Sequence, residues 1–537
     1  MVRGRLLGGI AGAALVIGVI TILARVAGFG RWLVFSHTVG QTCLGTAYAT
    51  ANQVPNVVFE IVAGGALASV VVPVLAGPIA RGDRAYADRT VSALLSWTLV
   101  VTVPLVVVGL AVTGPVMRLL VPSGADGCAA STVVATGAPM LAMFLPQIAI
   151  YGVAVVLGGT LQAHRRFVAP AVMPLVNSLV VAGAYVAFAV LADGRQDDVA
   201  ALPDTAWIVL AAGTTAGVLG LAVTVVVPMW RTGIRLRPTL RFPPGVARRV
   251  WSLAAAGLAA LVAQQVSTVV VIWLANNVGG YVLFYTYAWA LYLLPYAVLA
   301  VPLATSTFQR LSTLAHDGDT DGFARTTAST TRMVLLASCL GGAALAGVAV
   351  PVARVFVQDT SGVADPAVLA AAVVAFAPGV VGYGLVAHLG RVLYACGKGR
   401  TAAVATVTGW LTVVVADVVL VAVVPRDDLV TALGAGNSIG MTVAGVLLVV
   451  GTAQALGRTG LAGSLRAVGV GVGAGLIAAV AGGFVGELGG VAGKAGSVGQ
   501  ALAAGLAVAL VFGALAWLCD GRDMRALVRG RLRRDRS

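Results

Sequence analysis

The segment Arg25-Val-Ala-Gly-Phe-Gly-Arg31 places two permanent positive charges inside an apolar stretch that is long enough to cross a membrane. The chain is almost wholly apolar from Leu6 to Ala24, and it becomes apolar again from Trp32 to Phe35. A charge inside a membrane span is costly and usually serves a function. A guanidinium stays protonated, and its planar set of N–H donors matches a phosphate group. We therefore expect Arg25 and Arg31 to face a water-filled cavity that receives an anionic lipid headgroup.

The rest of the chain has the composition of a polytopic membrane protein. Of its 537 residues, 59% are hydrophobic and 10% are charged, whereas about 25% are charged in a typical soluble domain. The mean hydropathy is +0.97. One span needs about 20 apolar residues, and the apolar blocks divide into about fourteen such segments. The sequence thus predicts an all-α polytopic membrane protein. A cleaved signal peptide is disfavoured, because the first apolar run continues into the arginine motif and further spans follow.

The positive charge is distributed as expected for membrane topology rather than for nucleic-acid binding. The net charge is +15, from 35 Lys and Arg against 20 Asp and Glu. With both termini cytoplasmic, every Lys and Arg falls on the cytoplasmic side except a few in spans or outside: Arg25, Arg31, Arg118, Arg195, Arg354, Arg426 and Lys494. This asymmetry follows the positive-inside rule. It predicts a multi-pass membrane protein with both termini cytoplasmic, whose basic tail contacts anionic membrane lipids.

A basic linker divides the chain. Residues 231–249 contain six arginines and the pair Pro243-Pro244. We expect a six-helix half over 1–230, a second six-helix half over 250–456, two additional helices over 457–519, and a basic cytoplasmic tail over 520–537. Pro55 and Pro295 occupy matching places in the second span of each half. A faint repeat of this kind is typical of transporters with two halves around a central cavity.

Several polar residues interrupt the predicted spans. Asn56 and Glu60 follow Pro55 in the second span, where a proline bends the helix unless its neighbours compensate. Asn177 and Gln265 lie in later spans, and we expect them with Asn56 to bind substrate beside the two arginines. Glu60 and Asp417 are acids inside spans and are candidates for ion or proton coupling. Alternatively, Glu60 only neutralises an arginine.

No pattern of residues indicates catalysis, a metal or a cofactor. The five cysteines show no paired spacing, which predicts neither a disulfide framework nor a zinc site: Cys43, Cys128, Cys339, Cys396 and Cys519. The four histidines are isolated: His37, His164, His316 and His388. No Walker-type loop is present, so direct use of ATP is not expected. No nucleophile–base pair appears among the polar residues of the spans, and an enzyme is therefore not predicted.

Motifs along the whole chain resemble those of the MurJ (MviN) family. The two specific sets begin in the first predicted span and near the end of the fourth, and weaker agreement follows. They are Arg25-Val-x-Gly-Phe-x-Arg31, Val54-Pro55-Asn56, Gly65-Ala66-Leu67 and Val72-Pro73-Val74; Gly159-x-Leu161-x4-Arg166-Phe167-x2-Pro170 and Pro174-Leu175-Val176-Asn177; and Gln265-Val-Ser267 and Leu393-Tyr394.

The resemblance implies fourteen helices of the multidrug/oligosaccharidyl-lipid/polysaccharide (MOP) exporter superfamily. It also implies a flippase that carries lipid II, the undecaprenyl-pyrophosphate-linked peptidoglycan unit, to the outer leaflet. Arg25 and Arg31 match the family's arginines in the first span. The chain departs from the family at four charged positions, where it has Thr46, Phe59, Trp289 and Ala290.

These departures leave three interpretations open. The first is a flippase of a polyprenyl-pyrophosphate-linked cell-wall precursor, lipid II by resemblance, that works by alternating access. The second is a flippase or exporter of another lipid-linked glycan. The third is a scaffold that has lost transport and recruits cell-wall synthesis proteins, because a fold does not fix a function.

Overall fold

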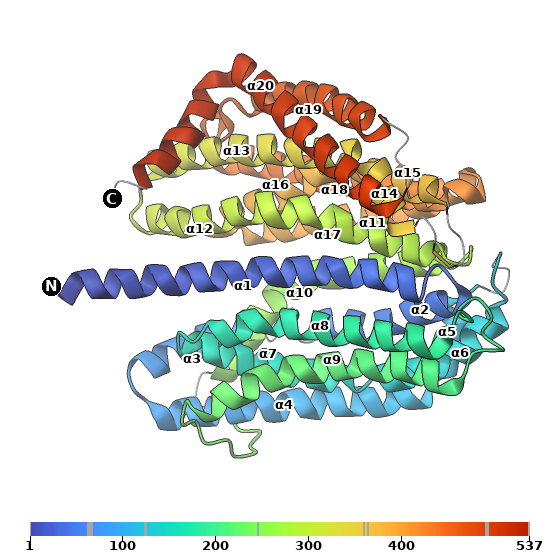
Figure 1. The fold of residues 1–537 in the computed structure, drawn as a ribbon. Coiled ribbons are helices and arrows are strands. Elements are labelled where there is room, and N and C mark those ends of the chain that lie inside the picture. Colours follow the sequence, from blue (N-terminus) through green and yellow to red (C-terminus); the bar gives the residue numbers. More distant parts are fainter. Residues whose placement is uncertain are drawn as a thin grey trace. The chain divides into compact units, whose positions relative to one another are not determined.

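The protein is built from helices. The computed structural model describes residues 2–61, 68–122, 126–243, 246–357, 360–361, 365–488 and 493–534. Within these ranges the regular secondary structure is helical and no strand is present, which confirms the all-α prediction (Figure 1). The motif residues Gly65-Ala66-Leu67 and the side chains of the basic tail lie outside the described part.

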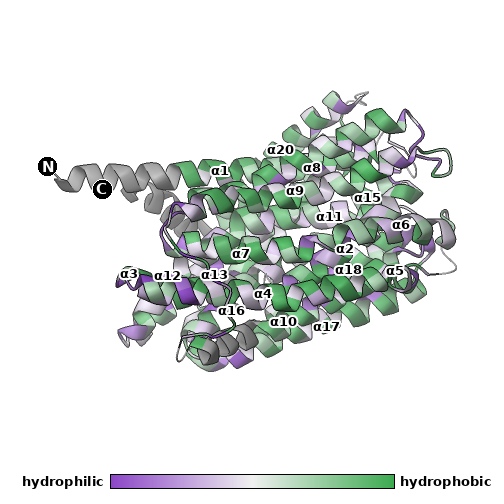
Figure 2. Ribbon diagram, turned by 90° about the horizontal axis from the view of Figure 1, so that it is seen from below, coloured by the Kyte–Doolittle hydropathy of each residue, from purple (hydrophilic) through white to green (hydrophobic). Residues whose placement is uncertain are grey.

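Most of the helices are long and apolar enough to cross a membrane. Twelve helices of the described chain meet this condition, and a bent pair of helices with a 42° break makes a thirteenth. A shorter apolar helix, Val71–Ala80, follows the undescribed residues 62–67. Figure 2 shows apolar residues along the helices and hydrophilic residues gathered in the loops. The polytopic membrane fold is confirmed, with a helix count close to the expected fourteen.

The first compact unit comprises Met1–Leu283 together with Asp359–Val363. Its helices run in order as α1 Val2–Thr38, α2 Cys43–Phe59, α3 Ala68–Ala80, α4 Arg84–Ala111, α5 Thr113–Leu120, α6 Ala130–Phe144, α7 Gln147–Ala163, α8 Val168–Ala192, α9 Asp204–Trp230 and α10 Val246–Ala275. The unit therefore includes α10, which the sequence division assigned to the second half. Because a packing unit need not coincide with a sequence repeat, the predicted halves and their central cavity stay predictions.

The second compact unit comprises Phe284–Gln358 and Ala364–Ser537. Its elements are α11 Tyr281–Pro295, which begins in the first unit, a π-helical turn Tyr296–Ala300, α12 Val301–His316, α13 Thr320–Gly347, α14 Ala349–Val357, α15 Pro366–Phe376, α16 Gly379–Ala395, α17 Gly399–Val423, α18 Leu429–Leu456, α19 Ser464–Glu487 and α20 Lys494–Arg534, with 3-10 turns at Arg426–Asp428 and Arg458–Leu461. Proline lacks the N–H that an α-helix needs, which explains the π-helical turn after Pro295.

The core of the first unit is organised around Tyr48 of α2. Its hydroxyl lies 2.9 Å from the Tyr185 hydroxyl of α8 and 2.8 Å from Thr214 Oγ1 of α9. Its ring packs against Phe35 of α1 and Phe144 of α6, at centroid distances of 5.1 and 5.4 Å. A buried tyrosine hydroxyl needs such partners. This residue therefore connects five helices and fixes where α1 lies within the unit.

Helix contacts in the second unit depend on glycine. A Cβ atom added to Gly382 of α16 would collide with the backbone oxygen of Met441 on α18. A Cβ added to Gly440 of α18 would lie 2.7 Å from the backbone oxygen of Gly409 on α17. Small residues let helix backbones approach closely, which is how membrane helices commonly associate. The packing of α16, α17 and α18 is therefore sensitive to single methyl groups.

We expect Gly382→Ala to destabilise the protein by about 2–3 kcal/mol, because the new methyl group must push α16 away from α18. Gly390→Ala is the matched control on the same helix, since its Cβ would meet no heavy atom within 4 Å. The control should be neutral or slightly stabilising, because alanine favours helix by up to about 1 kcal/mol. Melting temperatures of the two purified variants measure the difference, and equal values would contradict the packing argument.

A repeated turn precedes one helix in each unit. Gly82-Asp83 leads into α4 and Gly318-Asp319 leads into α13, and each glycine has a positive φ, of 74° and 71°. Each aspartate accepts a hydrogen bond from a backbone N–H three residues later, at 3.0 and 2.8 Å. An arginine follows six residues after each aspartate, at Arg89 and Arg325. The match supports the internal repeat that Pro55 and Pro295 suggest.

Candidate functional site

The two arginines of the opening motif lie on α1 but on different faces. Six residues of helix separate them by about 9 Å along the axis and about 120° around it. Arg25 is exposed, whereas Arg31 is half-buried. The Arg31 guanidinium lies 5.1 Å from the centroid of the Trp32 ring, and its Nε is buried without a hydrogen-bond partner among the described residues. Arg31 is thus a partly buried cation whose Nε–H has no acceptor among the described residues.

Tyr151 of α7 links Arg31 to the end of α2. It interacts electrostatically with Arg31 and also with Glu60. Its ring packs on Phe59, with centroids 4.3 Å apart. Arg31, Tyr151 and Glu60 therefore share one region of the first unit. Glu60 forms no ion pair with an arginine in the described part of the chain, so the interpretation of Glu60 as a simple arginine partner finds no support.

The predicted polar residues are spread over three other helices of the first unit. Asn56 is half-buried on α2, and its backbone oxygen accepts the N–H of Glu60. Asn177 of α8 faces Gly217 of α9, and its buried Oδ1 has no hydrogen-bond partner among the described residues. Gln265 of α10 is buried. The structure places Asn56 on the helix that leads to Glu60, whereas Asn177 lies in a helix–helix contact.

Asp417 belongs to the second unit, unlike the other candidates. It is fully buried on α17, and neither carboxyl oxygen has a hydrogen-bond partner among the described residues. A Cβ added to Gly436 of α18 would collide with Asp417 Oδ1, so only glycine fits opposite it. Burying a polar group without a partner is costly. The coupling roles of Asp417 and Glu60 stay predictions.

The four positions that depart from the family hold packing groups in place of charges. Thr46 Oγ1 donates to the backbone oxygen of Thr42 at 3.0 Å and accepts the N–H of Gly280 at 2.9 Å. Phe59 packs on Tyr151, as described above. In the second unit, Trp289 packs on Tyr292 and Phe376, with centroids 5.3 and 6.0 Å away, and Ala290 adds no polar group. A hydrogen bond and aromatic contacts thus replace the missing charges.

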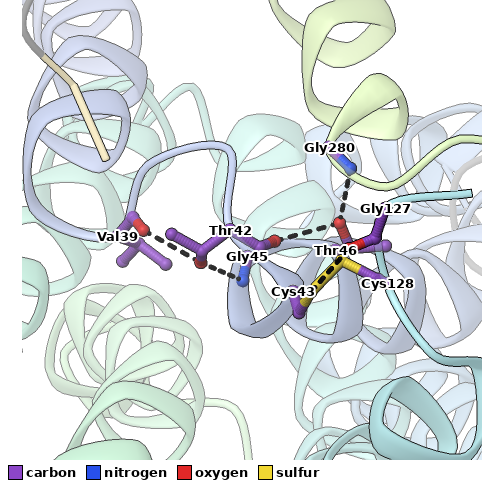
Figure 3. Close-up of a disulfide and its surroundings, with 8 residues drawn as sticks. All are labelled: Val39, Thr42, Cys43, Gly45, Thr46, Gly127, Cys128 and Gly280. Carbon is purple, nitrogen blue, oxygen red and sulfur yellow. Dashed lines mark hydrogen bonds between the residues drawn. A yellow bond between two sulfur atoms is a disulfide. The ribbon is translucent and has the colours of Figure 1, made fainter. Parts of the chain in front are cut away.

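Two features of the first unit were missed in the sequence. The first is Tyr151, for which the only signal was a tyrosine in the middle of an apolar span. The second is a disulfide between Cys43, at the start of α2, and Cys128, in the loop before α6 (Figure 3). The expectation of no disulfide is wrong for this pair. The two cysteines are 85 residues apart in the chain, yet their Cα atoms lie 5.6 Å apart, and sequence spacing carries no sign of this proximity.

Polar contacts surround the disulfide at this end of the unit. Thr42 Oγ1 accepts the N–H of Gly45 at 3.0 Å and donates to the Val39 oxygen at 3.1 Å, which caps α2. Thr46 contacts Gly280 as described, so the loop before α11 reaches the same place (Figure 3). The disulfide therefore lies within an ordered junction of α2, the α5–α6 loop and the α10–α11 loop.

Comparison with known proteins identifies the family. A family model described as lipid II flippase MurJ matches residues 35–517. The chain belongs to the MurJ family. A probable lipid II flippase MurJ of Rhizobium meliloti is 28% identical over 353 residues, which cover 64% of this chain and 62% of that protein. The lipid II flippase MurJ of Burkholderia cenocepacia is 30% identical over 318 residues, which cover 57% and 58%. The match to these MurJ relatives therefore spans about three fifths of their length.

Solved structures show the same fold. A lipid II flippase MurJ in an inward closed conformation has a TM-score of 0.72 at 17% identity, over 94% of this chain and 99% of that one. An inward-facing MATE family transporter of the MOP superfamily has a TM-score of 0.64 at 14% identity, over 85% and 98%. The MurJ resemblance of the motifs is thus confirmed at the level of the family, and these structures show the likeness of the fold.

Proposed function

We propose that the chain is a flippase for a polyprenyl-pyrophosphate-linked cell-wall precursor, lipid II by family likeness, which it moves from the inner to the outer leaflet by alternating access. The observation that carries the proposal is Arg31, a half-buried guanidinium inside a membrane-spanning helix whose Nε has no partner among the described residues. A charge held in this way is expensive unless a ligand compensates it. An anionic headgroup supplies that compensation.

The chemistry of the substrate explains the residue types. A pyrophosphate loses its hydration when it enters the bilayer, and guanidinium donors replace those hydrogen bonds. We assign the headgroup contacts to Arg25 and Arg31, with Asn56, Asn177 and Gln265 as neutral donors and acceptors. Glu60 and Asp417 are assigned to ion or proton coupling. The protein acts in this scheme as a transporter and not as an enzyme.

The disulfide supports the proposed orientation. Disulfides persist in oxidising compartments outside the cytoplasm. The Cys43–Cys128 end of the first unit therefore faces outward in the bacterial cytoplasmic membrane, and α1 carries the N-terminus to the cytoplasmic side. The positive-inside distribution predicts the same orientation, with both termini cytoplasmic. Anionic membrane lipids are then the natural contacts of the basic loops.

The packing groups at Thr46, Phe59, Trp289 and Ala290 favour a second candidate. Fewer charges at these positions suit a flippase of another lipid-linked glycan. They also suit a scaffold that retains the fold and recruits cell-wall synthesis proteins. The scaffold does not need Arg31 to touch a headgroup, whereas both transport functions do.

Complementation of a flippase-depleted bacterium tests the proposal. Expression of the chain is expected to restore growth and to restore lipid II in the outer leaflet, measured by a leaflet-specific assay, while an empty vector does neither. Membrane insertion is checked by fractionation. Growth without recovery of outer-leaflet lipid II would favour the scaffold, and failure of both in a correctly inserted protein would contradict lipid II as the substrate.

A further inference from the structure

An extended segment of the basic linker lies along α4 in the first unit. Backbone N–H groups of alternate linker residues donate to side chains spaced four residues apart on the helix. The bonds are Arg235 N–H to Asp88 Oδ1 at 3.2 Å, Arg237 N–H to Ser92 Oγ at 3.0 Å and Thr239 N–H to Ser96 Oγ at 3.1 Å. Two extended residues advance about 6.6 Å and four helical residues about 6 Å, so the two periods match. We call residues 234–242 the strap.

Both ends of the strap are anchored. Ile234 and Phe242 pack against the buried core formed by α3, α4, α7, α9 and the first residue of α10. Near the second end, the Trp97 indole N–H of α4 donates to the Leu240 oxygen at 3.0 Å. The strap follows α9 as the green coil beside one end of α4 in Figure 1. The strap, which lies in a linker that the sequence indicated only as a boundary, is therefore packed on the first unit.

A basic pocket of about 340 Å³ opens between the strap and α4. Its lining includes three guanidinium side chains, one carboxylate and two hydroxyls: Arg89, Arg235, Arg237, Asp88, Ser92 and Thr239. Asp88 already accepts the backbone N–H of Arg235. None of the three guanidiniums forms an ion pair with a carboxylate in the described part of the chain. The pocket thus keeps a surplus of positive charge and unused donors.

An apolar edge borders this pocket. Leu236 and Leu240 of the strap are 46% and 50% exposed, and Trp97 beside them is 41% exposed. Tryptophan is enriched where a membrane meets water, and α4 is itself a candidate span. A free phosphate ion has no apolar part that could pack against these side chains. A phospholipid fits both parts, since its headgroup is an anion and its acyl chains are apolar.

We propose that the strap pocket binds the phosphate headgroup of an anionic phospholipid, with the acyl chains against Leu236, Leu240 and Trp97. Arg89, Arg235 and Arg237 contact the phosphate, and Ser92 and Thr239 supply neutral hydrogen-bonding groups. This lipid is distinct from a transported substrate, because the pocket contains none of the residues assigned to transport. The site makes the basic linker a specific lipid contact and not only a topology signal.

Binding of phosphatidylglycerol to the purified full chain in uncharged detergent tests the proposal. The pocket variant is Arg89→Gln with Arg235→Gln and Arg237→Gln. The matched control, Arg81→Gln with Arg84→Gln and Arg241→Gln, removes three exposed charges that do not line the pocket. We expect the pocket variant to bind phosphatidylglycerol at least about tenfold more weakly and the control less than about threefold, by titration with native mass spectrometry. Equal losses in both variants would overturn the site in favour of diffuse charge.

Two further measurements identify the ligand, and the first uses a variant that keeps every guanidinium and is checked for normal folding. Leu236→Ser with Leu240→Ser keeps every guanidinium and changes only exposed side chains, so weaker phosphatidylglycerol binding with normal folding supports the acyl contact. Unchanged binding by this variant would overturn that contact. Inorganic phosphate that binds the wild type as tightly as the lipid would identify a free-anion site and overturn the lipid assignment.

Discussion

Replacing Arg25 and Arg31 together by alanine is expected to abolish translocation while leaving the protein in the membrane. Each hydrogen bond to a charged group contributes about 1.5–3 kcal/mol, so loss of both cations should slow flipping by at least about a hundredfold. Insertion survives, since removing charges from α1 makes that span more apolar. The leaflet-specific lipid II assay in the depleted strain measures the rate, and fractionation measures the amount of protein.

The single variants separate the two arginines. Arg31 is half-buried beside Tyr151, whereas Arg25 is exposed, so Arg31→Ala alone should cause the larger loss. Arg81→Ala with Arg84→Ala removes two exposed charges at the turn between α3 and α4 and serves as the control. Flipping by the double alanine variant at the wild-type rate would exclude these arginines as headgroup ligands. Growth of the depleted strain on that variant without flipping would instead support the scaffold.

Hydropathy made the membrane spans predictable. The apolar stretches from Leu6 to Ala24 and from Trp32 to Phe35 lie in one helix, α1, Val2–Thr38. The length of the apolar segment is visible in the sequence, because many consecutive residues contribute to its hydropathy. Gly40, in the turn after the helix, is visible as well. A break within a span is harder to predict than the span itself. The bend between α15 and α16 lies at Ala377-Pro378-Gly379, where Pro-Gly is a break signal in the sequence, but the 42° angle depends on the packing of the folded unit.

The candidate site was less predictable than the spans. The sequence identifies Arg31 and Glu60 by their charge, but Tyr151, which contacts their region, is one of 11 tyrosines in the chain. Asn177 matched a family motif, yet its side chain lies against Gly217 between α8 and α9. Which polar side chain meets which depends on contacts between distant helices, and a single sequence does not record them.

Loss of the disulfide is expected to cause the second large effect. Cys43→Ser with Cys128→Ser frees a loop of 85 residues in the unfolded chain, which corresponds to about 4.6 kcal/mol of loop-closure entropy. The melting temperature of the purified protein should fall by roughly 4 °C, because the unfolding entropy of a chain of 537 residues is large. The wild type treated with reductant should have the same melting temperature as the double variant, because both lack the same covalent link.

The folded junction should nevertheless survive this change, because polar contacts also hold it. The Gly280 N–H donates to Thr46 Oγ1 at 2.9 Å, and the Gly279 N–H donates to the Asp126 oxygen at 2.7 Å. Alkylation of the denatured, unreduced wild type should find three free thiols, at Cys339, Cys396 and Cys519, so a Cys396→Ser and Cys519→Ser variant is the stability control. Five free thiols in protein taken from the membrane would contradict the disulfide. They would also remove the argument that this end of the first unit faces an oxidising compartment, leaving the orientation to the distribution of arginines alone.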